Sequence, residues 1–384
     1  MLSNQTKKLN KIPFLKPYLP NYDKIHIKFE ECLNSGQLSK GKWLKKYEAI
    51  LESDMEVKNV IGVSSGTIGL ILALKALKIG SGDEVIVPSF TFCSTVHAIK
   101  IVGAKPVFAD CKITDFTIDE SILESKITSK TKAILAVHIF GVPAAVEEIK
   151  KISEKYSLKV VYDAAHAMGT KYKNIPIGQY GDISVYSTSP TKTLVTGEGG
   201  IIVTKHDDIA KQIRLLIEYG NPGDYNCTEI GINGRLSELS SIVGYESFKI
   251  LKDNLKLRTH KANLYYKHLE TIEGIELQRF SKEIIDSTYK DFSIVVKKEF
   301  GINRDQLSNI LNKLGIPTKK YFYPAIHKMY AYKEYNDIYL PNTEYLSKNI
   351  LSLPIYAELD DEIILDIVRI IKDIKNNKGK YLNY

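Results

Sequence analysis

Residues 187–200 read Ser187-Thr188-Ser189-Pro190-Thr191-Lys192-Thr193-Leu194-Val195-Thr196-Gly197-Glu198-Gly199-Gly200 and join two apolar segments that are typical of β-strands. A lysine in a hydroxyl-rich turn that runs into a glycine cluster is an unusual place for a merely solvated charge. An amine whose pKa is lowered by its surroundings is the group that forms Schiff bases with carbonyl compounds. Taken alone, Lys192 also fits an ordinary surface lysine, because the chain carries 53 lysines and arginines.

Apolar, β-branched runs alternate with helical patterns on both sides of this stretch. The predicted strands are Val60–Val63, Glu84–Val87, Pro106–Ala109, Lys132–Val137, Lys159–Tyr162, Ser184–Ser187 and Gly200–Thr204. The predicted helices are Thr67–Lys78, Cys93–Val102, Ala144–Tyr156 and Asp207–Tyr219. This alternation predicts an α/β fold, in which a large and mostly parallel sheet carries helices on both faces. Within the first of these helices, Ile68–Leu77 is apolar nearly all round, so we expect it to be buried.

The flanking segments predict a helical N-terminal arm and a smaller C-terminal unit. Helical patterns cover Lys24–Leu33 and Lys45–Leu51, and a long one covers Leu236–Leu269. Beyond it we expect strands at Asp291–Lys297 and Pro317–Tyr321 and helices at Asn303–Leu314, Asn342–Leu351 and Asp361–Lys375. We therefore expect an N-terminal arm and a large α/β domain over residues 1–245. A bridging helix and a small α+β domain are expected over residues 246–384.

Composition narrows the class of protein. With 384 residues, of which 44% are hydrophobic, the chain can build roughly two or three packed units. The net charge is +8, and the positive and negative residues are interspersed along the chain. This pattern favours a lysine-rich solvated surface over a nucleic-acid-binding face. The four cysteines form no C-x-x-C pair, so neither a zinc site nor a disulfide framework is predicted, and we expect no metal. Because the N-terminus is polar and no apolar run is long enough to span a membrane, we expect a cytoplasmic protein.

Ser64-Ser65-Gly66-Thr67 lies between a predicted strand and the apolar helix. The unpaired amides of a helix N-terminus favour an anion, and Gly66 would let that anion approach the backbone closely. An ordinary serine or threonine helix cap explains the same residues. The segment has neither the G-x-G-x-x-G of dinucleotide folds nor the G-K-[ST] of P-loops, which argues against both nucleotide sites.

Two further segments follow predicted strands. Val161-Tyr162-Asp163-Ala164-Ala165-His166-Ala167 places one carboxylate at a strand end, although a loop-capping role would also explain Asp163. Pro88-Ser89-Phe90-Thr91-Phe92 offers an aromatic ring for a flat ligand, although such a residue is more often core. Together the segments supply a lysine, a carboxylate, a helix N-terminus and an aromatic face. Pyridoxal 5′-phosphate (PLP) needs these four features.

At this point the chain resembles the DegT/DnrJ/StrS family of fold-type I, PLP-dependent nucleotide-sugar aminotransferases. The resemblance covers nearly the whole sequence. It rests on the segments above and on Gly82–Phe92, Gly103–Phe108, Gly231-Ile232-Asn233-Gly234-Arg235-Leu236-Ser237-Glu238 and Leu351-Ser352-Leu353-Pro354. It implies a large domain with a mostly parallel, mixed sheet, a smaller α+β C-terminal domain, and a homodimer whose subunits share the active site.

The resemblance also implies roles for individual residues. Lys192 and Asp163 are the catalytic residues: Lys192 would form the Schiff base and shuttle the proton, and Asp163 would face the ring nitrogen. The other implied cofactor-binding residues are Ser65, Gly66, Thr67, Phe92, His166, Ser187 and, from the neighbouring subunit, Asn233. Tyr323 and His327 would lie near the sugar, and Lys319, Arg235, Lys40 and Lys42 are candidates for its anionic groups.

The activity implied is a ping-pong transfer of nitrogen from L-glutamate to a keto group of a nucleotide-diphosphate-linked deoxysugar. Thr196-Gly197-Glu198-Gly199-Gly200 resembles members that act at C4 more than those that act at C3. Three alternatives stay open: amination at C3, a PLP-dependent sugar lyase or dehydratase, and a non-catalytic PLP-fold regulator. Lys192 favours transamination, because dehydratases of the family carry histidine at this position.

Overall fold

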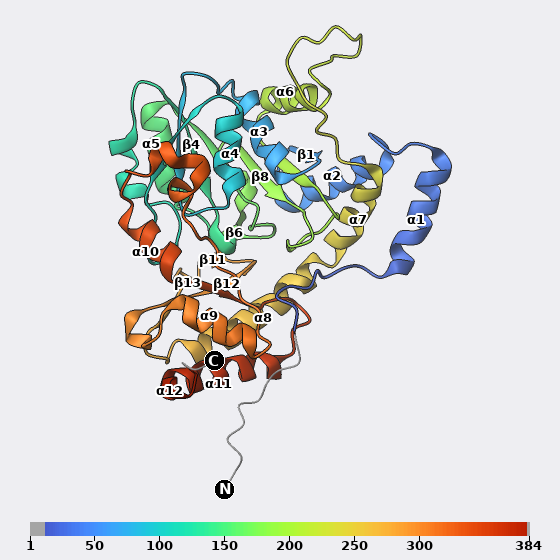
Figure 1. The fold of residues 1–384 in the computed structure, drawn as a ribbon. Coiled ribbons are helices and arrows are strands. Elements are labelled where there is room, and N and C mark those ends of the chain that lie inside the picture. Colours follow the sequence, from blue (N-terminus) through green and yellow to red (C-terminus); the bar gives the residue numbers. More distant parts are fainter. Residues whose placement is uncertain (1–11, 382–384) are drawn as a thin grey trace.

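The computed structural model describes residues 12–381. Seven of its strands form one sheet in the order β1-β9-β8-β5-β4-β2-β3 (Figure 1). Their bounds are β1 Asn59–Val63, β2 Glu84–Pro88, β3 Lys105–Ala109, β4 Thr131–Val137, β5 Lys159–Asp163, β8 Ile183–Ser187 and β9 Gly200–Thr204. In this sheet β9 runs antiparallel to its neighbours β1 and β8, whereas the pairs from β8 to β3 are parallel. The predicted mostly parallel, mixed sheet is confirmed.

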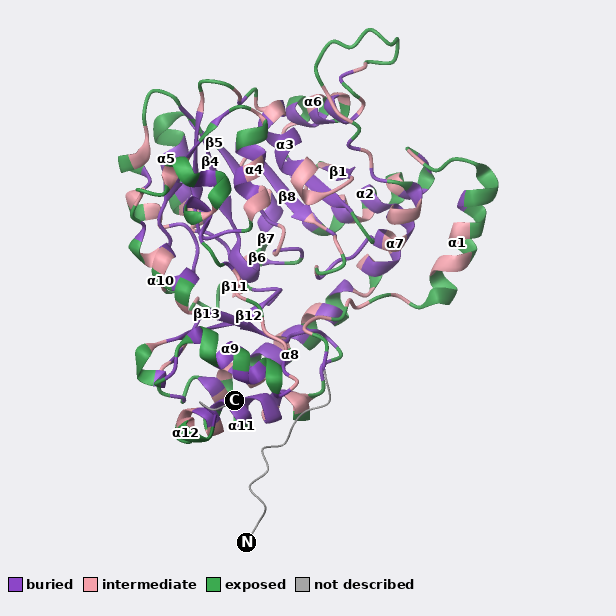
Figure 2. Cartoon of the chain, viewed as in Figure 1, coloured by how far each residue is buried: buried purple, intermediate pink, exposed green. Residues whose placement is uncertain are grey.

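Helices cover both faces of this sheet, and Figure 2 shows the strands buried between them. One face carries α3 (Gly66–Ala76), α4 (Cys93–Ile101) and α6 (Asp207–Ile217). The other carries α2 (Lys42–Met55) and α5 (Val146–Tyr156). Side chains alternate between the faces along each strand: in β5, Val161 packs on the first face, and Val160 and Tyr162 pack on the second. Helix α3 is buried along most of its length, as its all-round apolar sequence predicts.

The C-terminal part of the chain builds a second sheet with its own core. Strands β10 (Ile275–Leu277), β12 (Phe292–Val296) and β13 (Ile350–Leu353) pair in that order. They pack with α8 (Leu251–Leu269), α9 (Arg304–Lys313) and α11 (Asp361–Asn376). The remaining elements are α1 Tyr22–Ser35, α7 Glu238–Lys249, α10 Pro341–Asn349, α12 Lys378–Tyr381, and the short strands β6 Lys171–Tyr172, β7 Ile175–Pro176 and β11 Ile285–Asp286.

Three predicted elements differ from the structure. The helix predicted over Leu236–Leu269 is two helices, α7 and α8, which meet at Ile250. The helix predicted over Asn342–Leu351 ends earlier and leads directly into β13. Pro317–Tyr321 is not a strand, because only Lys319 makes a bridge to β13. In the last two cases the sequence pattern is too short for local propensity to decide between helix, strand and loop.

Two expectations concern the chain as a whole. The predicted domain boundary between residues 245 and 246 falls inside α7 and stays a prediction. The polar residues at the N-terminus, on which the expectation of a cytoplasmic protein rests, lie outside the described residues. Among residues 12–381, no helix combines the length and the apolar character needed to cross a bilayer.

Candidate active site

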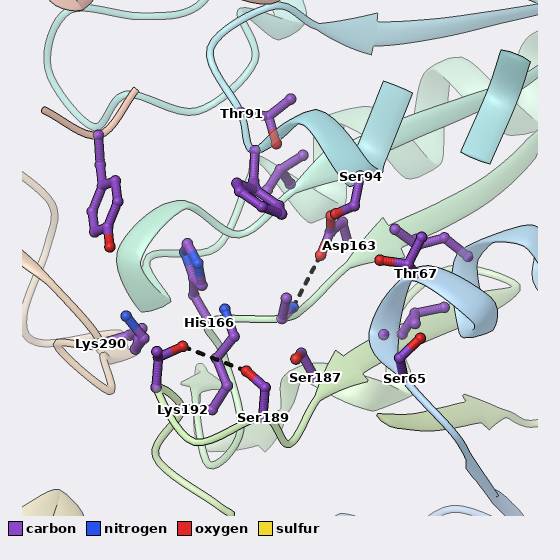
Figure 3. A pocket seen from close by; sticks show the side chains of 18 of the residues that line it. Ser65, Thr67, Thr91, Ser94, Asp163, His166, Ser187, Ser189, Lys192 and Lys290 are labelled. Carbon is purple, nitrogen blue, oxygen red and sulfur yellow. Dashed lines mark hydrogen bonds between the residues drawn. The ribbon is translucent and has the colours of Figure 1, made fainter. Parts of the chain in front are cut away.

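A cavity of about 490 Å³ opens at one edge of the large sheet. The carboxyl ends of β1, β2, β5 and β8 meet at this edge because these strands are parallel. Eight of the predicted residues line the cavity, and Figure 3 shows the side chains of six of them around it, namely Ser65, Thr67, Asp163, His166, Ser187 and Lys192. They are Ser65, Gly66, Thr67, Phe92, Asp163, His166, Ser187 and Lys192. Phe92 lies at the rim with 56% of its surface exposed.

The N-terminus of α3 forms one end of the cavity. The side-chain oxygen of Ser65 accepts a hydrogen bond from the amide of Ile68 at 3.1 Å, so Ser65 is the helix cap. Helix geometry leaves the amides of Gly66 and Thr67 without a partner inside the helix. A Cβ at Gly66 would lie 3.0 Å from the Cβ of Ser187, so a side chain at position 66 would fill the space between helix and strand. This cradle of amides and hydroxyls fits a phosphate group.

Asp163 ends β5 with a buried carboxylate that is 4% exposed. Oδ2 accepts a hydrogen bond from the hydroxyl of Thr95 at 2.7 Å, and Oδ1 accepts one from the amide of Ala165 at 3.1 Å. Burial raises the pKa of Asp163, and these two donors and the charge of Lys192 oppose that rise. A carboxylate held in this way is stabilised further by a cationic N–H group, which is what a protonated pyridine ring offers.

Lys192 faces the same cavity from the turn that follows β8. Its backbone amide donates to the carbonyl of Ser189 at 3.0 Å, which fixes the turn. Burial and, next, the positive charge of Lys290 lower the pKa of Lys192 to about 8, although Asp291 and Asp163 oppose the shift. The amine therefore loses its proton far more readily than a solvated lysine, which suits it to attack a carbonyl carbon.

His166 is held as a neutral ring. Its Nδ1 accepts a hydrogen bond from the amide of Phe140 at 3.2 Å, so a neutral ring carries its proton on Nε2. Burial and the charges of Lys192 and Lys290 lower the pKa of His166 well below its usual value. The ring also stacks on Phe140 and Phe322, with centroids 6.0 and 6.3 Å away. His166 can thus donate one hydrogen bond without adding charge.

The cavity also contains residues that sequence reasoning missed. From the start of β12 come Lys290 and Asp291, which are 3% and 4% exposed and form an ion pair at 2.8 Å. The neighbouring loop adds Tyr321 and Phe322. Thr95, the partner of Asp163, carries no sequence signal of its own. For the ion pair there was a signal: a Lys-Asp pair directly precedes an apolar strand that must be buried.

Asn233, predicted to bind the cofactor of the neighbouring subunit, and the candidate substrate residues lie outside the cavity lining. Asn233 is exposed on a segment that bridges to Glu218. Arg235 donates to Glu218 at 2.9 Å and lies over the ring of Tyr219, and Lys40 pairs with the same glutamate at 3.4 Å. Lys42 pairs with Glu31. These cations are therefore already matched by carboxylates within this chain.

The aromatic-x-Pro-x-x-His region divides in two. Tyr323 is 53% exposed, and its ring lies 4.8 Å from the guanidinium of Arg304. His327 is fully buried: Nδ1 is 2.6 Å from the hydroxyl of Ser89, and Nε2 is 3.3 Å from a carboxylate oxygen of Glu344. His327 thus belongs to a packing network, and neither His327 nor Tyr323 lines the cavity. Lys319 pairs with Ser352 through its backbone.

Comparisons with known proteins agree on one family. A sequence model described as the DegT/DnrJ/EryC1/StrS aminotransferase family matches residues 22–372. The chain is 33% identical to a GDP-perosamine synthase of Escherichia coli O157:H7, over 96% of this chain and 99% of that protein. It is 33% identical to a dTDP-4-amino-4,6-dideoxy-D-glucose transaminase of Shigella dysenteriae, with coverages of 95% and 97%.

A relative whose name gives C3 of the sugar as the position of amination is nearly as similar as the 4-amino sugar transaminase. The UDP-N-acetyl-3-dehydro-alpha-D-glucosamine 3-aminotransferase of Acidithiobacillus ferrooxidans is 32% identical, with 92% of this chain and 95% of that protein covered. Among solved structures, DesI in the presence of its TDP-sugar product superimposes with a TM-score of 0.91 at 26% identity. That match covers 97% of this chain and 95% of DesI.

Proposed function

The chain belongs to the DegT/DnrJ/EryC1/StrS aminotransferase family, and on that premise we propose that it moves an amino group from L-glutamate to the C4 keto group of a nucleotide-diphosphate-linked deoxysugar. It is a PLP-dependent transaminase. The observation that supports the proposal best is the convergence of Lys192, Asp163 and the α3 N-terminus on one cavity. The product would be an amino sugar for a polysaccharide or another glycan.

The residues around the cavity fit PLP by their chemistry. The amides and hydroxyls of Ser65, Gly66, Thr67 and Ser187 would hold the phosphate, and Asp163 would face the ring nitrogen. When bound, PLP carries the amino group between the two substrates and stabilises negative charge on the substrate carbon. Asp163 supports that chemistry because its carboxylate keeps a proton on the ring nitrogen.

Lys192 is the group in this cavity that can move protons. With a pKa of about 8, its amine can take a proton from the substrate carbon and its ammonium can return one. Because His166 is held neutral, we propose that it donates a hydrogen bond from Nε2 to an oxygen of the cofactor. Phe92 would lie against the ring from the rim of the cavity.

Amination at C4 is the finer part of the proposal. The glycine-rich ending Thr196–Gly200 and the C4-acting relative of Shigella dysenteriae support it, whereas the Acidithiobacillus ferrooxidans relative supports C3 as the alternative. We propose in addition a homodimer in which Asn233 reaches the phosphate of the neighbouring subunit. Asn233 is exposed and does not line the cavity of its own chain, which supports that placement.

A substrate panel tests the function. The PLP-loaded enzyme is incubated with L-glutamate and with UDP-, dTDP- and GDP-linked 3-keto and 4-keto sugars, and the products are identified by mass spectrometry and NMR. We expect an amino sugar and an equal amount of 2-oxoglutarate from a 4-keto substrate. Turnover of the sugar without L-glutamate would instead identify a lyase or dehydratase. Exchange confined to free amino acids and simple keto acids would overturn the sugar proposal.

A further inference from the structure

The carboxylate of Asp291 lies near two buried cations beside the cavity, Lys290 and Arg258. Lys290 donates to Oδ1 of Asp291 at 2.8 Å. Behind this pair, the buried guanidinium of Arg258 from α8 donates to the backbone carbonyls of Tyr289 and Lys290 at 2.8 and 2.7 Å. Burial lowers the pKa of Arg258, and the negative charge of Asp291 opposes that shift. A single negative charge among these groups leaves a net positive charge on side chains that are 3–4% exposed.

The ammonium of Lys290 has unused capacity. It carries three N–H donors, and within residues 12–381 its ion pair with Asp291 uses one of them. Lys290 lines the cavity, and Figure 3 shows it on the same side as Lys192 and His166. His166 is neutral, and within residues 12–381 Lys290 pairs with Asp291 and forms no ion pair with Asp163, so neither His166 nor Asp163 neutralises this cation. A buried cation that faces a cavity with free donors is a binding site for an anion.

We infer that Lys290 binds the carboxylate of the amino donor and so selects an amino acid for the first half of the transfer. The inference rests on the proposed function, because it assigns the donor to the same cavity. Asp291 is a positioning residue here, since it holds the ammonium through one oxygen. Arg258 positions the backbone that carries both side chains.

The chemistry of the two substrates favours the donor over the sugar nucleotide as the source of the anion. In an amino acid the carboxylate is bonded to the carbon that bears the reacting nitrogen. An anion-binding group that lies beside Lys192 therefore lies where that carboxylate must be. In a nucleotide-linked sugar the diphosphate is attached at C1, several bonds from a keto group at C3 or C4. The negative charge of the second substrate, on its diphosphate, therefore lies farther from the reacting carbon.

The test measures binding without turnover. Glutarate and its neutral isostere glutaramide are titrated into the PLP-loaded enzyme by calorimetry, and UDP and dTDP serve as diphosphate probes. The variants are Lys290→Met and Lys290→Gln, of which the second keeps a donor for Asp291. Lys252→Met is the matched control, because the side chain of Lys252 is 88% exposed and lies away from this cavity.

We expect the wild-type enzyme to prefer glutarate to glutaramide. In both Lys290 variants the affinity for glutarate should fall on the order of tenfold to a hundredfold, while the affinities for glutaramide and for the nucleotides change by less than about threefold. Equal weakening of glutarate and glutaramide would indicate damage to the cavity and would overturn the inference. So would unchanged glutarate binding, loss confined to UDP or dTDP, or the absence of a charge preference in the wild-type enzyme. A failed sugar panel together with Lys290-dependent glutarate binding would remove the sugar function alone.

Discussion

Asp163 carries a charge that its surroundings disfavour. Its carboxylate is 4% exposed, burial raises its pKa, and Thr95, Ala165 and the charge of Lys192 stabilise the ionised form. A residue kept for stability alone would not place a carboxylate here. The arrangement is explained if a cationic group of a ligand completes it, as a protonated ring nitrogen does.

A substitution at position 163 should affect activity and stability differently. In Asp163→Asn we expect transamination to fall on the order of a hundredfold or more, because the ring nitrogen loses its anionic partner. The free energy of unfolding of the cofactor-free protein should stay the same or rise, since a buried charge is removed. Activity assays and urea unfolding check both quantities. A joint loss of activity and of stability would contradict the account.

The pKa of Lys192 predicts how cofactor capture depends on pH. Only the unprotonated amine attacks an aldehyde, so the rate of PLP incorporation into cofactor-free enzyme should rise with pH and level off above about 8. The charge of Lys290 lowers this pKa, so Lys290→Met should move the rise to higher pH. Absorbance of the bound cofactor follows the reaction. A shift to lower pH in the variant would show that Lys290 acts in another way.

At the scale of elements, the site depends on the short distance between the start of α3 and the end of β8. A Cβ at Gly66 would lie 3.0 Å from that of Ser187, which leaves room for backbone amides and a ligand but not for a side chain. The same junction includes Gly200, where a Cβ would lie 2.6 Å from the carbonyl carbon of Ser65. Strand β9 can therefore pair beside the cradle only with glycine at this point.

We expect Gly66→Ala to weaken PLP binding by roughly fivefold to a hundredfold, because crowding against Ser187 costs about 1–3 kcal/mol. The helix itself should not suffer, since alanine is a better helix former than glycine. Gly80→Ala is the control, because its nearest neighbour would be the carbonyl oxygen of Val102 at 3.5 Å, an ordinary contact. Equilibrium dialysis of PLP measures the effect. Equal affinity of Gly66→Ala and the wild-type enzyme for PLP would show that the α3 N-terminus does not hold the phosphate.

The elements also show how far a single sequence leads. The strands of the large sheet are predictable, because buried parallel strands are short apolar runs between turn residues. Lys192, Asp163 and Ser65–Thr67 are predictable because each lies at the end of such a strand or in the turn that follows it. Thr95 is not, because its partner Asp163 lies far away in the sequence. The pair Lys290 and Asp291 has a local signal, but only the fold brings it to the cavity of Lys192. For the same reason, the contact between Ser89 and His327 has no local signal.

On the scale of the whole molecule, α8 links the two sheets and the cavity lies between them. Arg258 on this helix satisfies the carbonyls of Tyr289 and Lys290 at the entry to β12. The guanidinium is buried, so both carbonyls would lose their partner in a single substitution. The second unit is thereby held in the position from which Lys290 and Asp291 reach the cavity.

We expect Arg258→Met to lower the free energy of unfolding by about 3 kcal/mol, because it leaves two buried carbonyls unpaired. Urea unfolding measures this change. Lys261→Met on the same helix is a suitable control, since Lys261 pairs with the half-exposed Asp361 and should contribute much less. A loss in Arg258→Met no larger than that of the control would show that this contact does not hold the two units together.

Transamination at this cavity depends on one covalent link between Lys192 and PLP, and trapping that link with borohydride tests it most directly. The PLP-loaded protein is reduced with and without prior addition of L-glutamate, digested, and searched by mass spectrometry for the pyridoxyl group. We expect the label on Lys192 without L-glutamate and its near-complete loss after L-glutamate is added, because the donor's amino group takes the place of the lysine. A label on another lysine, or one on Lys192 that L-glutamate does not reduce, would contradict an aminotransferase acting at this cavity.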